Sequence, residues 1–375
     1  MRLDSEKETS EIISLYFQNP QLKTFESNTR PNMLQPLIQL AEKGILPDSL
    51  ICVGIRSICR ERLRWAQAVG PESVEAYHQE WVDKLSESPI ALVPEKANEQ
   101  HYEVPPAFFE QVLGKHLKYS SGYWPTGAET LDESETAMLE ITCQRSELED
   151  GMDILELGCG WGSLTCFMAA RMPNAKIMAV SNSNDQRKYI EQRCERNGYG
   201  NVTVVTADMN NFTTSEAFDR VVSVEMFEHM RNYDELLRRI SNYLKVDGKL
   251  FVHIFSHESL VYPFEDNGPS DWMGREFFSG GQMPSHRLLL HFQNDLKIEK
   301  VWRVSGIHYG KTSWAWLRKM DQNKTAILRI FSSTYGPENA KVWWQRWRIF
   351  FMSCAELFSM NHGKEWGVSH YLFVK

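Results

Sequence analysis

From about residue 150 onward, short apolar runs alternate with segments of helical pattern, and this alternation constrains the fold more than any other feature. The runs typical of strands are MDILELG, AKIMAVS, NVTVVTAD, FDRVVSVEM and KLFVHIF. Helical segments of about 10–15 residues separate most of them. Strands that alternate with helices in this way predict a parallel, doubly wound sheet. Two further strand-like runs, LKIEKVWRV and GVSHYLFVK, follow near the C-terminus.

Two regions outside this alternation have patterns of their own. Residues 33–69 predict two helices, because MLQPLIQLAEKG ends at Gly44 and the amphipathic run LICVGIRSICRERLRWAQAVG ends at Gly70. Residues 257–286 are rich in Gly, Pro and Ser and interrupt the rhythm of the core. A segment of this composition between strands predicts a lid or an excursion over a functional site.

Composition and charge disfavour several classes of protein. A chain of 375 residues with 42% hydrophobic and 12% aromatic residues can bury one large core or two modest ones, so disorder is not expected. The net charge of -8 argues against a general nucleic-acid binder. Seven cysteines without a CxxC pair predict neither a disulfide framework nor a metal site. The charged N-terminus lacks an apolar signal core, and no apolar run reaches the ~18 residues of a membrane span. We therefore expect a soluble, cytoplasmic protein with no integral membrane segment.

The first strand of the alternation leads into a glycine-rich loop, ILELGCGWGSLT. Gly158, Gly160 and Gly162 stand at alternate positions, with a helical segment after them and Glu156 just before them. Such a loop lets a ligand approach the backbone closely at the N-terminus of a helix. Tight strand-to-helix turns also use glycine for structural reasons, but the strand, the helix and the acidic residue together favour a nucleotide-like ligand.

The end of the second strand narrows the choice of ligand. A dinucleotide site requires an Asp or Glu there, about 20 residues after the glycines, to bind a ribose. This chain has Ser181 and Asn182 at that point, and it contains no GxxxxGK[ST] P-loop. NAD and a P-loop nucleotide are therefore disfavoured. S-adenosylmethionine remains, because it has no phosphates and its ammonium and ribose suit a loop flanked by a carboxylate.

Six separated motifs resemble, in their order, those of the cyclopropane fatty acid synthase-like methyltransferases. They are HYEVPPAFFEQVLG, YSSGYW, ILELGCGWGSLT, AVSNSNDQ, VEMFEHM and SGIHYGKTSWAWL. Within that family the chain is most similar to the coclaurine N-methyltransferase-like branch, of which FFSGGQMPS, LHFQNDL and ELFSMNHGKEWGVSHYLF are typical. The resemblance covers roughly residues 30–375.

The resemblance implies the class I methyltransferase fold, an α/β, Rossmann-like sheet of seven strands with the last strand antiparallel. It also implies N-terminal and C-terminal helices that cover the active site. We therefore expect four regions along the chain. These are an N-terminal helical cap over residues 1–100, a core that binds S-adenosylmethionine over 101–256, a lid or excursion over 257–290, and the last strands with the C-terminal substrate-pocket helices over 291–375.

Carried over position by position, the resemblance implies a cofactor site for S-adenosylmethionine, with S-adenosylhomocysteine as the product. Tyr119 and Ser120 would touch the methionine part, and Gly158 and Gly160 would pass beneath it. Glu156 flanks the same loop. The other implied residues are Ser181, Asn182 and Gln186 near the ribose, Asp208 and Met209 around the adenine, and Val224 beside the sulfonium.

The fourth strand, in FDRVVSVEMFEHM, ends with two carboxylates and an imidazole. Ligands bind at the carboxyl ends of strands in open α/β sheets, so these groups are candidates for catalysis. Glu225 and His229 are four residues apart and would share one face if the chain turns helical there. A carboxylate that orients an imidazole makes a general base near neutral pH. A salt bridge between the two at the start of a helix is the structural alternative.

Comparison of two branches of the family bears on the substrate. Lipid cyclopropane synthases typically have Gly at the position of Glu225, and they hold a bicarbonate base with Cys, Glu, His and Tyr. Here Ser121 stands at the cysteine position, while Glu228, His229 and Tyr309 match. The plant-like amine methyltransferases carry Glu at the position of Glu225 but commonly have Phe at that of Tyr309. The site therefore resembles both branches in part.

The chemistry of methyl transfer favours an amine substrate. An alkylamine in water is mostly protonated and has no lone pair, so Glu225 would bind the ammonium and His229 would remove its proton as the methyl group moves. Glu228 would point to another side and hold the loop. We therefore expect N-methylation of a small aromatic or alkyl amine, without a requirement for bicarbonate. The alternative is a lipid methyltransferase or cyclopropane synthase that acts on unsaturated acyl chains, and a homodimer is left open.

The sequence gives weaker evidence that other residues line the pocket. Cys354 matches a cysteine once proposed as active in the family, but a buried packing cysteine is the simpler interpretation. One or two rings of WWQRWRIFF, with Trp344 as a candidate, are expected to line the substrate pocket, as is Ser121. Glu356 is either a second amine anchor or the salt-bridge partner of an arginine on its own helix. We expect core or surface roles for four histidines, namely His253, His257, His308 and His370.

Overall fold

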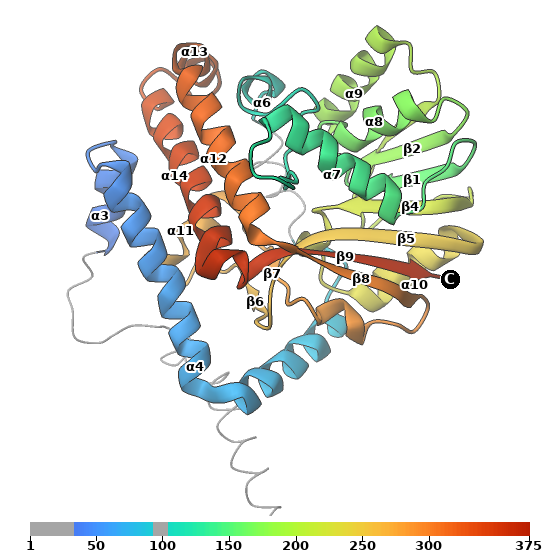
Figure 1. Cartoon of the computed structure of the whole chain (residues 1–375), viewed down its shortest axis with the longest axis horizontal. Helices are drawn as coiled ribbons and strands as arrows, with labels where there is room; N and C mark the ends of the chain where they lie inside the picture. Colours follow the sequence, from blue (N-terminus) through green and yellow to red (C-terminus); the bar gives the residue numbers. More distant parts are fainter. Residues whose placement is uncertain (1–33, 93–103) are drawn as a thin grey trace, which may run out of the picture.

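The computed structural model describes residues 34–92 and 104–375, and its centre is the predicted sheet (Figure 1). Seven strands lie in the order β3-β2-β1-β4-β5-β9-β8. Their bounds are β1 Asp153–Leu157, β2 Lys176–Ser181, β3 Val202–Thr206, β4 Phe218–Val224, β5 Leu244–His257, β8 Lys297–Ser305 and β9 Trp366–Val374. The strands β1 to β5 are parallel to one another, and β9 is antiparallel to both β5 and β8. All seven strand predictions, and the antiparallel last strand, are therefore confirmed.

Each strand divides its side chains between two cores, because successive residues point to opposite faces of a sheet. Ile154 and Val222 pack with the helices α7 (Leu131–Arg145) and α8 (Ser163–Arg171). Their chain neighbours Leu155 and Val221 pack on the other face with α10 (Tyr233–Tyr243). The helix α9 (Asn184–Asn197) packs against β3 beside α8. The sheet is buried on both faces, as parallel sheets are.

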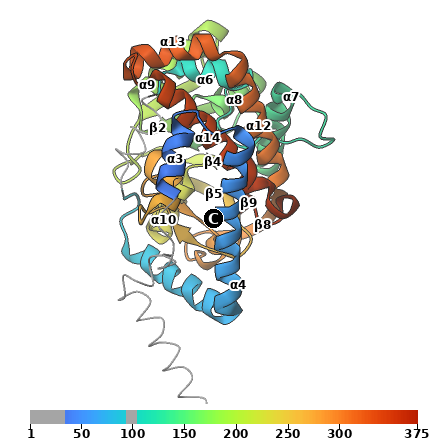
Figure 2. The same cartoon turned by 90° about the vertical axis from the view of Figure 1, so that its left-hand side faces the viewer.

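A third apolar cluster holds the helices that cover the carboxyl ends of the parallel strands, and we call these helices the roof. Their bounds are α3 Leu34–Glu42, α4 Asp48–Glu87, α6 Pro106–Val112, α12 Gly306–Gln322, α13 Lys324–Tyr335 and α14 Ala340–Ser359. Phe108 of α6 lies 4.7 Å from the ring of Trp347 on α14, measured between ring centroids. Figure 2 shows α3 and the first part of α4 in front of α14. Segments from both ends of the chain therefore build the roof together.

The second predicted helix does not stop at Gly70. Gly70 has φ 81° and ψ 164°, and the helix resumes at Pro71 and runs to Glu87. Glycine adopts a positive φ at little cost, and proline is well suited to the first turn of a helix, so the pair makes a sharp bend rather than an end. The first arm packs on α14, and the second runs beneath the sheet to α10 (Figure 1). There Ser86 donates a hydrogen bond to Asp234 at 2.7 Å.

The Gly-rich excursion forms a small subdomain beside the sheet. Its elements are the hairpin β6 (Tyr262–Pro263) and β7 (Gln282–Met283), the 3₁₀ helix η3 (Pro269–Asp271) and α11 (Trp272–Phe277). Arg231, which follows β4, donates to the carbonyls of Gly280 and Gly281 at 2.9 Å each. Phe277 stacks on Phe350 of α14 with ring centroids 4.4 Å apart. The excursion is thus fixed to both the sheet and the roof.

Two short 3₁₀ helices lie between the excursion, the roof and the last strands. They are η4 Leu288–His291, before β8, and η5 Met360–Gly363, between α14 and β9. Within the two described ranges, no helix is both long enough and apolar enough to cross a membrane.

Candidate active site

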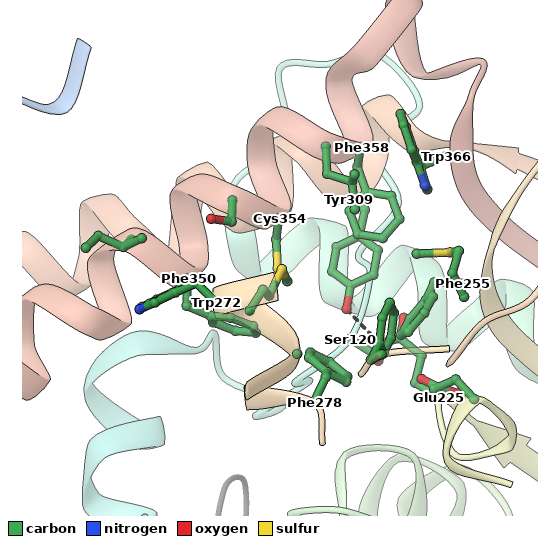
Figure 3. A pocket seen from close by; sticks show the side chains of 18 of the residues that line it. Ser120, Glu225, Phe255, Trp272, Phe278, Tyr309, Phe350, Cys354, Phe358 and Trp366 are labelled. Carbon is green, nitrogen blue, oxygen red and sulfur yellow. Dashed lines mark hydrogen bonds between the residues drawn. The ribbon is translucent and has the colours of Figure 1, made fainter. Parts of the chain in front are cut away.

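A cavity of about 620 Å³ lies between the carboxyl ends of β1 and β4 and the roof. Its size suits a small-molecule site, for which about 300–1,000 Å³ is usual. Figure 3 shows how residues from α11, α12, α14 and the sheet point into it. A second cavity of about 60 Å³ adjoins the first, and the two share Gly158, Gly160, Gln186 and His229.

Only one of the three glycines in the loop leaves open space for a ligand. All three have positive φ: 80° at Gly158, 52° at Gly160 and 75° at Gly162. A Cβ added at Gly158 would lie 2.7 Å from Met226, and one at Gly162 would lie 2.7 Å from Ile190. A Cβ at Gly160 would meet no atom within 4 Å. Gly158 and Gly162 are therefore needed for packing, whereas Gly160 faces the open cavity.

The residues predicted for the cofactor all line one of the two cavities. In the larger cavity these are Tyr119, Ser120, Glu156, Gly158, Gly160, Gln186 and Val224. In the smaller cavity they are Ser181, Asn182, Asp208 and Met209, together with the shared residues. Ser181 donates a hydrogen bond to the Oε1 atom of Gln186 at 2.6 Å, which orients that amide.

Several polar groups in the cavity wall have no hydrogen-bond partner among the described residues. Among them are the Nε1 atom of Trp161, the Oγ atom of Ser163 and the Nε2 atom of Gln186. Buried donors without partners are costly, so these donors are suited to a polar ligand in the cavity. S-adenosylmethionine, with its carboxylate, ribose hydroxyls and purine, can satisfy such donors. The sequence did not single out Trp161 or Ser163, although both stand in the glycine loop.

Glu156 supplies a titratable group to the same wall. Burial raises the pKa of this carboxyl to about 8, and a hydrogen bond from Thr165 at 2.5 Å opposes the rise. A neighbouring cation would favour the ionised form. Glu156 therefore suits the cationic groups of S-adenosylmethionine.

Glu225 lies just past the end of β4, with a side chain that is 9% exposed. Its φ of 49° is left-handed, so the chain does not meet the condition of an α-helix under which Glu225 and His229 would share one face. The Oε2 atom accepts a hydrogen bond from the Tyr309 hydroxyl at 2.7 Å (Figure 3). The Oε1 atom lies 3.3 Å from both the Ser121 amide and the Nε2 atom of His253. Burial raises the pKa of Glu225, while the Lys118 ammonium and the Tyr309 hydroxyl lower it.

His229 does not share a helical face with Glu225. It ends the 3₁₀ helix η2 (Phe227–His229), and its ring is parallel to that of Phe278 with centroids 5.7 Å apart. Burial, and then the Arg231 cation, lower the pKa of His229 to about 4, so the imidazole is neutral at neutral pH. The imidazole at hydrogen-bond distance from Glu225 is that of His253, for which the sequence predicted an ordinary core or surface role.

Glu228 lines the same cavity as Glu225, whereas the sequence predicted that it points to another side. Its residue surface is 1% exposed, and its Oε2 atom has no hydrogen-bond partner within the described parts of the chain. Burial, and then the charge of Glu225, raise its pKa well above the usual value. Burial and the charge of Glu225 therefore favour the protonated form of Glu228, whose hydroxyl is a hydrogen-bond donor.

Lys118 is a charged residue of the site that the sequence did not reveal. It lines the cavity, it is 2% exposed, and its ammonium donates a hydrogen bond to Ser120. Burial lowers the pKa of Lys118 to about 8, although Glu225 and Glu135 raise it. Its position directly before Tyr119 and Ser120 was the available signal. A buried cation near Glu225 offsets part of the cost of burying that carboxylate.

Aromatic side chains form much of the remaining wall. Figure 3 labels six that point into the cavity, namely Phe255, Trp272, Phe278, Phe350, Phe358 and Trp366. Cys354 lies among them, and burial raises its pKa, with the charge of Glu225 adding to the effect, so that the thiol stays protonated. This agrees with a packing role. Within residues 34–92 and 104–375, no group of three or more His, Cys, Asp or Glu side chains is placed to hold a metal ion.

Three weaker candidates do not line either cavity. Ser121 turns its hydroxyl to the Gly122 carbonyl at 3.0 Å and offers Glu225 only its backbone amide. Trp344 packs in the roof, with the Lys324 ammonium 5.5 Å from its ring. Glu356 pairs with Arg56 of α4 at 2.8 Å, and so it neither lines the cavity nor pairs with an arginine of α14. Helical periodicity alone could not tell which face of α14 meets the cavity.

Comparison with known proteins agrees with this geometry. Residues 93–366 match the family described as mycolic acid cyclopropane synthetase. The (S)-coclaurine N-methyltransferase of Thalictrum flavum subsp. glaucum is 36% identical over 343 residues, which cover 90% of this chain and 95% of that protein. The crystal structure of coclaurine N-methyltransferase bound to N-methylheliamine and SAH has a TM-score of 0.88 at 35% identity, and the match covers 92% of this chain and 100% of that one. Mycolic acid cyclopropane synthase CmaA1, complexed with SAH and CTAB, shares the fold with a TM-score of 0.63 at 23% identity, over 76% of this chain and 99% of that one.

The seven-stranded sheet, the glycine loop and the cavity define a class I S-adenosylmethionine-dependent methyltransferase. Within that class, the chain belongs to the mycolic acid cyclopropane synthetase family.

Proposed function

We propose that this enzyme transfers the methyl group of S-adenosylmethionine to the nitrogen of a small, largely apolar amine. The observation that carries the proposal is Glu225, a carboxylate enclosed in a cavity whose other walls are mainly apolar and aromatic. A buried carboxylate without a bound cation is costly, so a site that keeps one is suited to a cationic ligand. The names of the similar relatives, (S)-coclaurine N-methyltransferase and pavine N-methyltransferase, point to the same chemistry.

Glu225 would hold the substrate as an ammonium ion. Tyr309 and the Ser121 amide both donate to this carboxylate, so its orientation is set before a ligand arrives. The aromatic walls add attraction, because a cation near a ring face gains about 0.5–2 kcal/mol. The same burial lowers the pKa of the ammonium, since a low-dielectric site disfavours the charged form. The cavity thus binds the cation and also makes its proton easier to remove.

His229 would take that proton. Its low pKa keeps the imidazole neutral, the form in which it can accept a proton, and it lines both cavities where they meet. Bound S-adenosylmethionine supplies a methyl group on a sulfonium, which reacts with a nitrogen lone pair in line with the S–CH3 bond. Glu228, a neutral acid, would donate a hydrogen bond to the bound ligands rather than act as a base.

The second candidate function is modification of an unsaturated acyl chain, as the family description suggests. Retention of Glu228 and Tyr309, which resemble the bicarbonate ligands of lipid synthases, favours it. Glu225 argues against it, because an ionised carboxylate at the tip of β4 would repel a bicarbonate ion nearby.

A labelled-methyl assay separates the two candidates. The enzyme is incubated with S-adenosylmethionine carrying a labelled methyl group, either with a panel of aromatic and alkyl amines or with vesicles of an unsaturated phospholipid. We expect label on amine nitrogen. Label only in the acyl chains, with none in any amine, would overturn the proposal.

Two substitutions test the roles of the residues. Replacing a buried ionic partner costs about 3–5 kcal/mol, so Glu225→Gln should lower kcat/KM for the amine by about 10²–10⁴-fold. His229→Ala should lower kcat by about 10²–10⁴-fold. Glu356→Gln is the matched control, because Glu356 pairs with Arg56 outside the cavity lining. It should leave KM for the amine unchanged.

A further inference from the structure

A chain of hydrogen bonds runs from the cavity through the sheet to the far end of α7. The Oε1 atom of Glu225 lies 3.3 Å from the Nε2 atom of His253 on β5. The Nδ1 atom of His253 lies 2.9 Å from the Nε2 atom of His370 on β9. The Nδ1 atom of His370 lies 2.7 Å from the Nη1 atom of Arg145, the last residue of α7. Both histidines are 0% exposed.

The direction of this chain follows from the chemistry of its last member. An arginine guanidinium has only N–H donors and stays protonated in proteins, so the Nδ1 atom of His370 must accept. Burial lowers the pKa of His370 and of His253 well below the usual value, and so both rings are neutral. A neutral imidazole that accepts at one nitrogen carries its proton on the other. His370 therefore donates from Nε2 to His253, and His253 in turn donates from Nε2 to Glu225.

We propose that Arg145 is a positioning residue for Glu225, because it fixes both histidines as Nε2–H tautomers and so directs an N–H donor at the Oε1 atom. The role rests on the proposed function of Glu225 as the anchor of the ammonium. In the opposite tautomer, a lone pair of His253 would face the carboxylate, and that contact would be repulsive unless Glu225 were protonated. Arg145 thus favours the ionised form of Glu225, although it does not line the cavity.

The geometry around the chain holds its members in place. His253 and His370 are directly opposite each other in the antiparallel pairing of β5 and β9. The guanidinium carbon of Arg145 lies 5.0 Å from the ring of Trp302 on β8, which packs it in place. A hydrogen bond to the ionised form lowers the pKa of a carboxyl, so the chain acts against the rise that burial causes.

Other groups also act on the ionisation of Glu225, from every element that packs against it. They are Lys118 and the Ser121 amide from the segment before α7, Glu228 and His229 from η2, His253 from β5, Tyr309 from α12 and Cys354 from α14. Of these groups, His253 is the one that hydrogen bonds link to Arg145, through His370. A change at Arg145 should therefore alter the pKa of Glu225 through His253.

The tautomers can be observed without any substrate. Long-range proton–nitrogen correlation spectra of protein labelled with ¹⁵N only in histidine distinguish a proton on Nδ1 from one on Nε2. Signals are assigned with the variants His253→Asn and His370→Asn, and only variants with a wild-type circular dichroism spectrum are used. We expect both rings as neutral Nε2–H tautomers at pH 7. A proton on Nδ1 of either ring, or a charged ring, would overturn the proposal even if no amine were methylated.

Kinetics then test the consequence for Glu225. Arg145→Met removes all the hydrogen-bond donors of the side chain at this partly exposed position. The acidic limb of the kcat/KM profile should then move to higher pH by about 1 unit. Arg145→Lys keeps a donor-only cation and should restore the wild-type profile. His370→Asn leaves the charge of Arg145 in place but breaks the chain, so it should shift the limb as Arg145→Met does. Either of two results would show that the chain has no such role. One is an Arg145→Met profile that matches the wild type. The other is a His370→Asn profile that matches the wild type while the Arg145→Met profile is shifted.

Discussion

Removal of one hydroxyl, in Tyr309→Phe, should change how the enzyme responds to pH without changing its fold. The hydroxyl donates to the Oε2 atom of Glu225 at 2.7 Å, a distance typical of strong hydrogen bonds to charged acceptors. The ring itself stacks on Phe358, with centroids 4.2 Å apart and planes 12° from parallel. Phenylalanine keeps that ring contact, so the substitution removes the hydrogen bond alone.

The size of the shift in the pH profile follows from the free energy of that hydrogen bond. A hydrogen bond to a charged group contributes about 1.5–3 kcal/mol, and one pKa unit corresponds to about 1.36 kcal/mol. The bond stabilises the ionised form, so its loss raises the pKa of Glu225 by about 1–2 units. Amine binding requires the ionised carboxylate, and activity is lost as pH falls through the pKa. The acidic limb of the kcat/KM profile should therefore move to higher pH by about 1–2 units.

The assay is methyl transfer to one amine across a range of pH, with the wild type and the variant side by side. Ionisation of the free amine affects both profiles equally, so the difference between them reports on the enzyme. Tyr243→Phe is the matched control, since its hydroxyl donates to the Phe212 carbonyl at 2.9 Å and does not line the cavity. Coincident profiles for Tyr309→Phe and the wild type would refute the reasoning.

Three further predictions concern the cofactor and the base. Gly160→Val should abolish binding of S-adenosylmethionine in calorimetry, because the added side chain would occupy the open cavity and a β-branched residue would strain the loop at φ 52°. Near-wild-type affinity in a variant with a wild-type circular dichroism spectrum would contradict this. Binding of S-adenosylmethionine should tighten as pH rises to about 8. The raised pKa of Glu156 leaves this carboxyl protonated below that pH, and a cationic ligand binds the ionised form more tightly. Titration should show proton release in the wild type but not in Glu156→Gln, and a pH-independent affinity would contradict the role. Amine methylation in degassed buffer should not increase when bicarbonate is added, and a large, saturable stimulation would favour the lipid reaction.

The sequence alone predicted the architecture and brought together the residues expected around the cofactor, because both depend on local patterns. Alternating apolar runs predict strands wherever they occur, and the loop ILELGCGWGSLT combines a strand end, its glycines and a helix start in one continuous stretch. The motifs that carried the family resemblance are continuous in the same way. Every residue predicted for the cofactor accordingly lines one of the two cavities.

The substrate side depended on contacts that no local pattern contains. The spacing of Glu225 and His229 would place them on one face only in a helix, but Glu225 adopts a left-handed φ, and its Oε1 atom lies within hydrogen-bond distance of His253. The periodicity of α14 showed an aromatic face but not its rotation, so Trp344 was expected in the cavity and lies in the roof. Lys118 was overlooked because a lysine is usually exposed, and only its enclosure beside Glu225 gives it significance.

The buried histidine pair shows most clearly what tertiary structure alone decides. His253 and His370 are 117 residues apart in the chain, and they meet because β9 inserts between β5 and β8 in one particular register. A shift of that register by one residue would turn His370 to the opposite face of the sheet, since side chains alternate along a strand. The apolar pattern of GVSHYLFVK predicts a strand, but its partner and its register are set by the packing of the whole sheet. That packing decides which donor reaches Glu225.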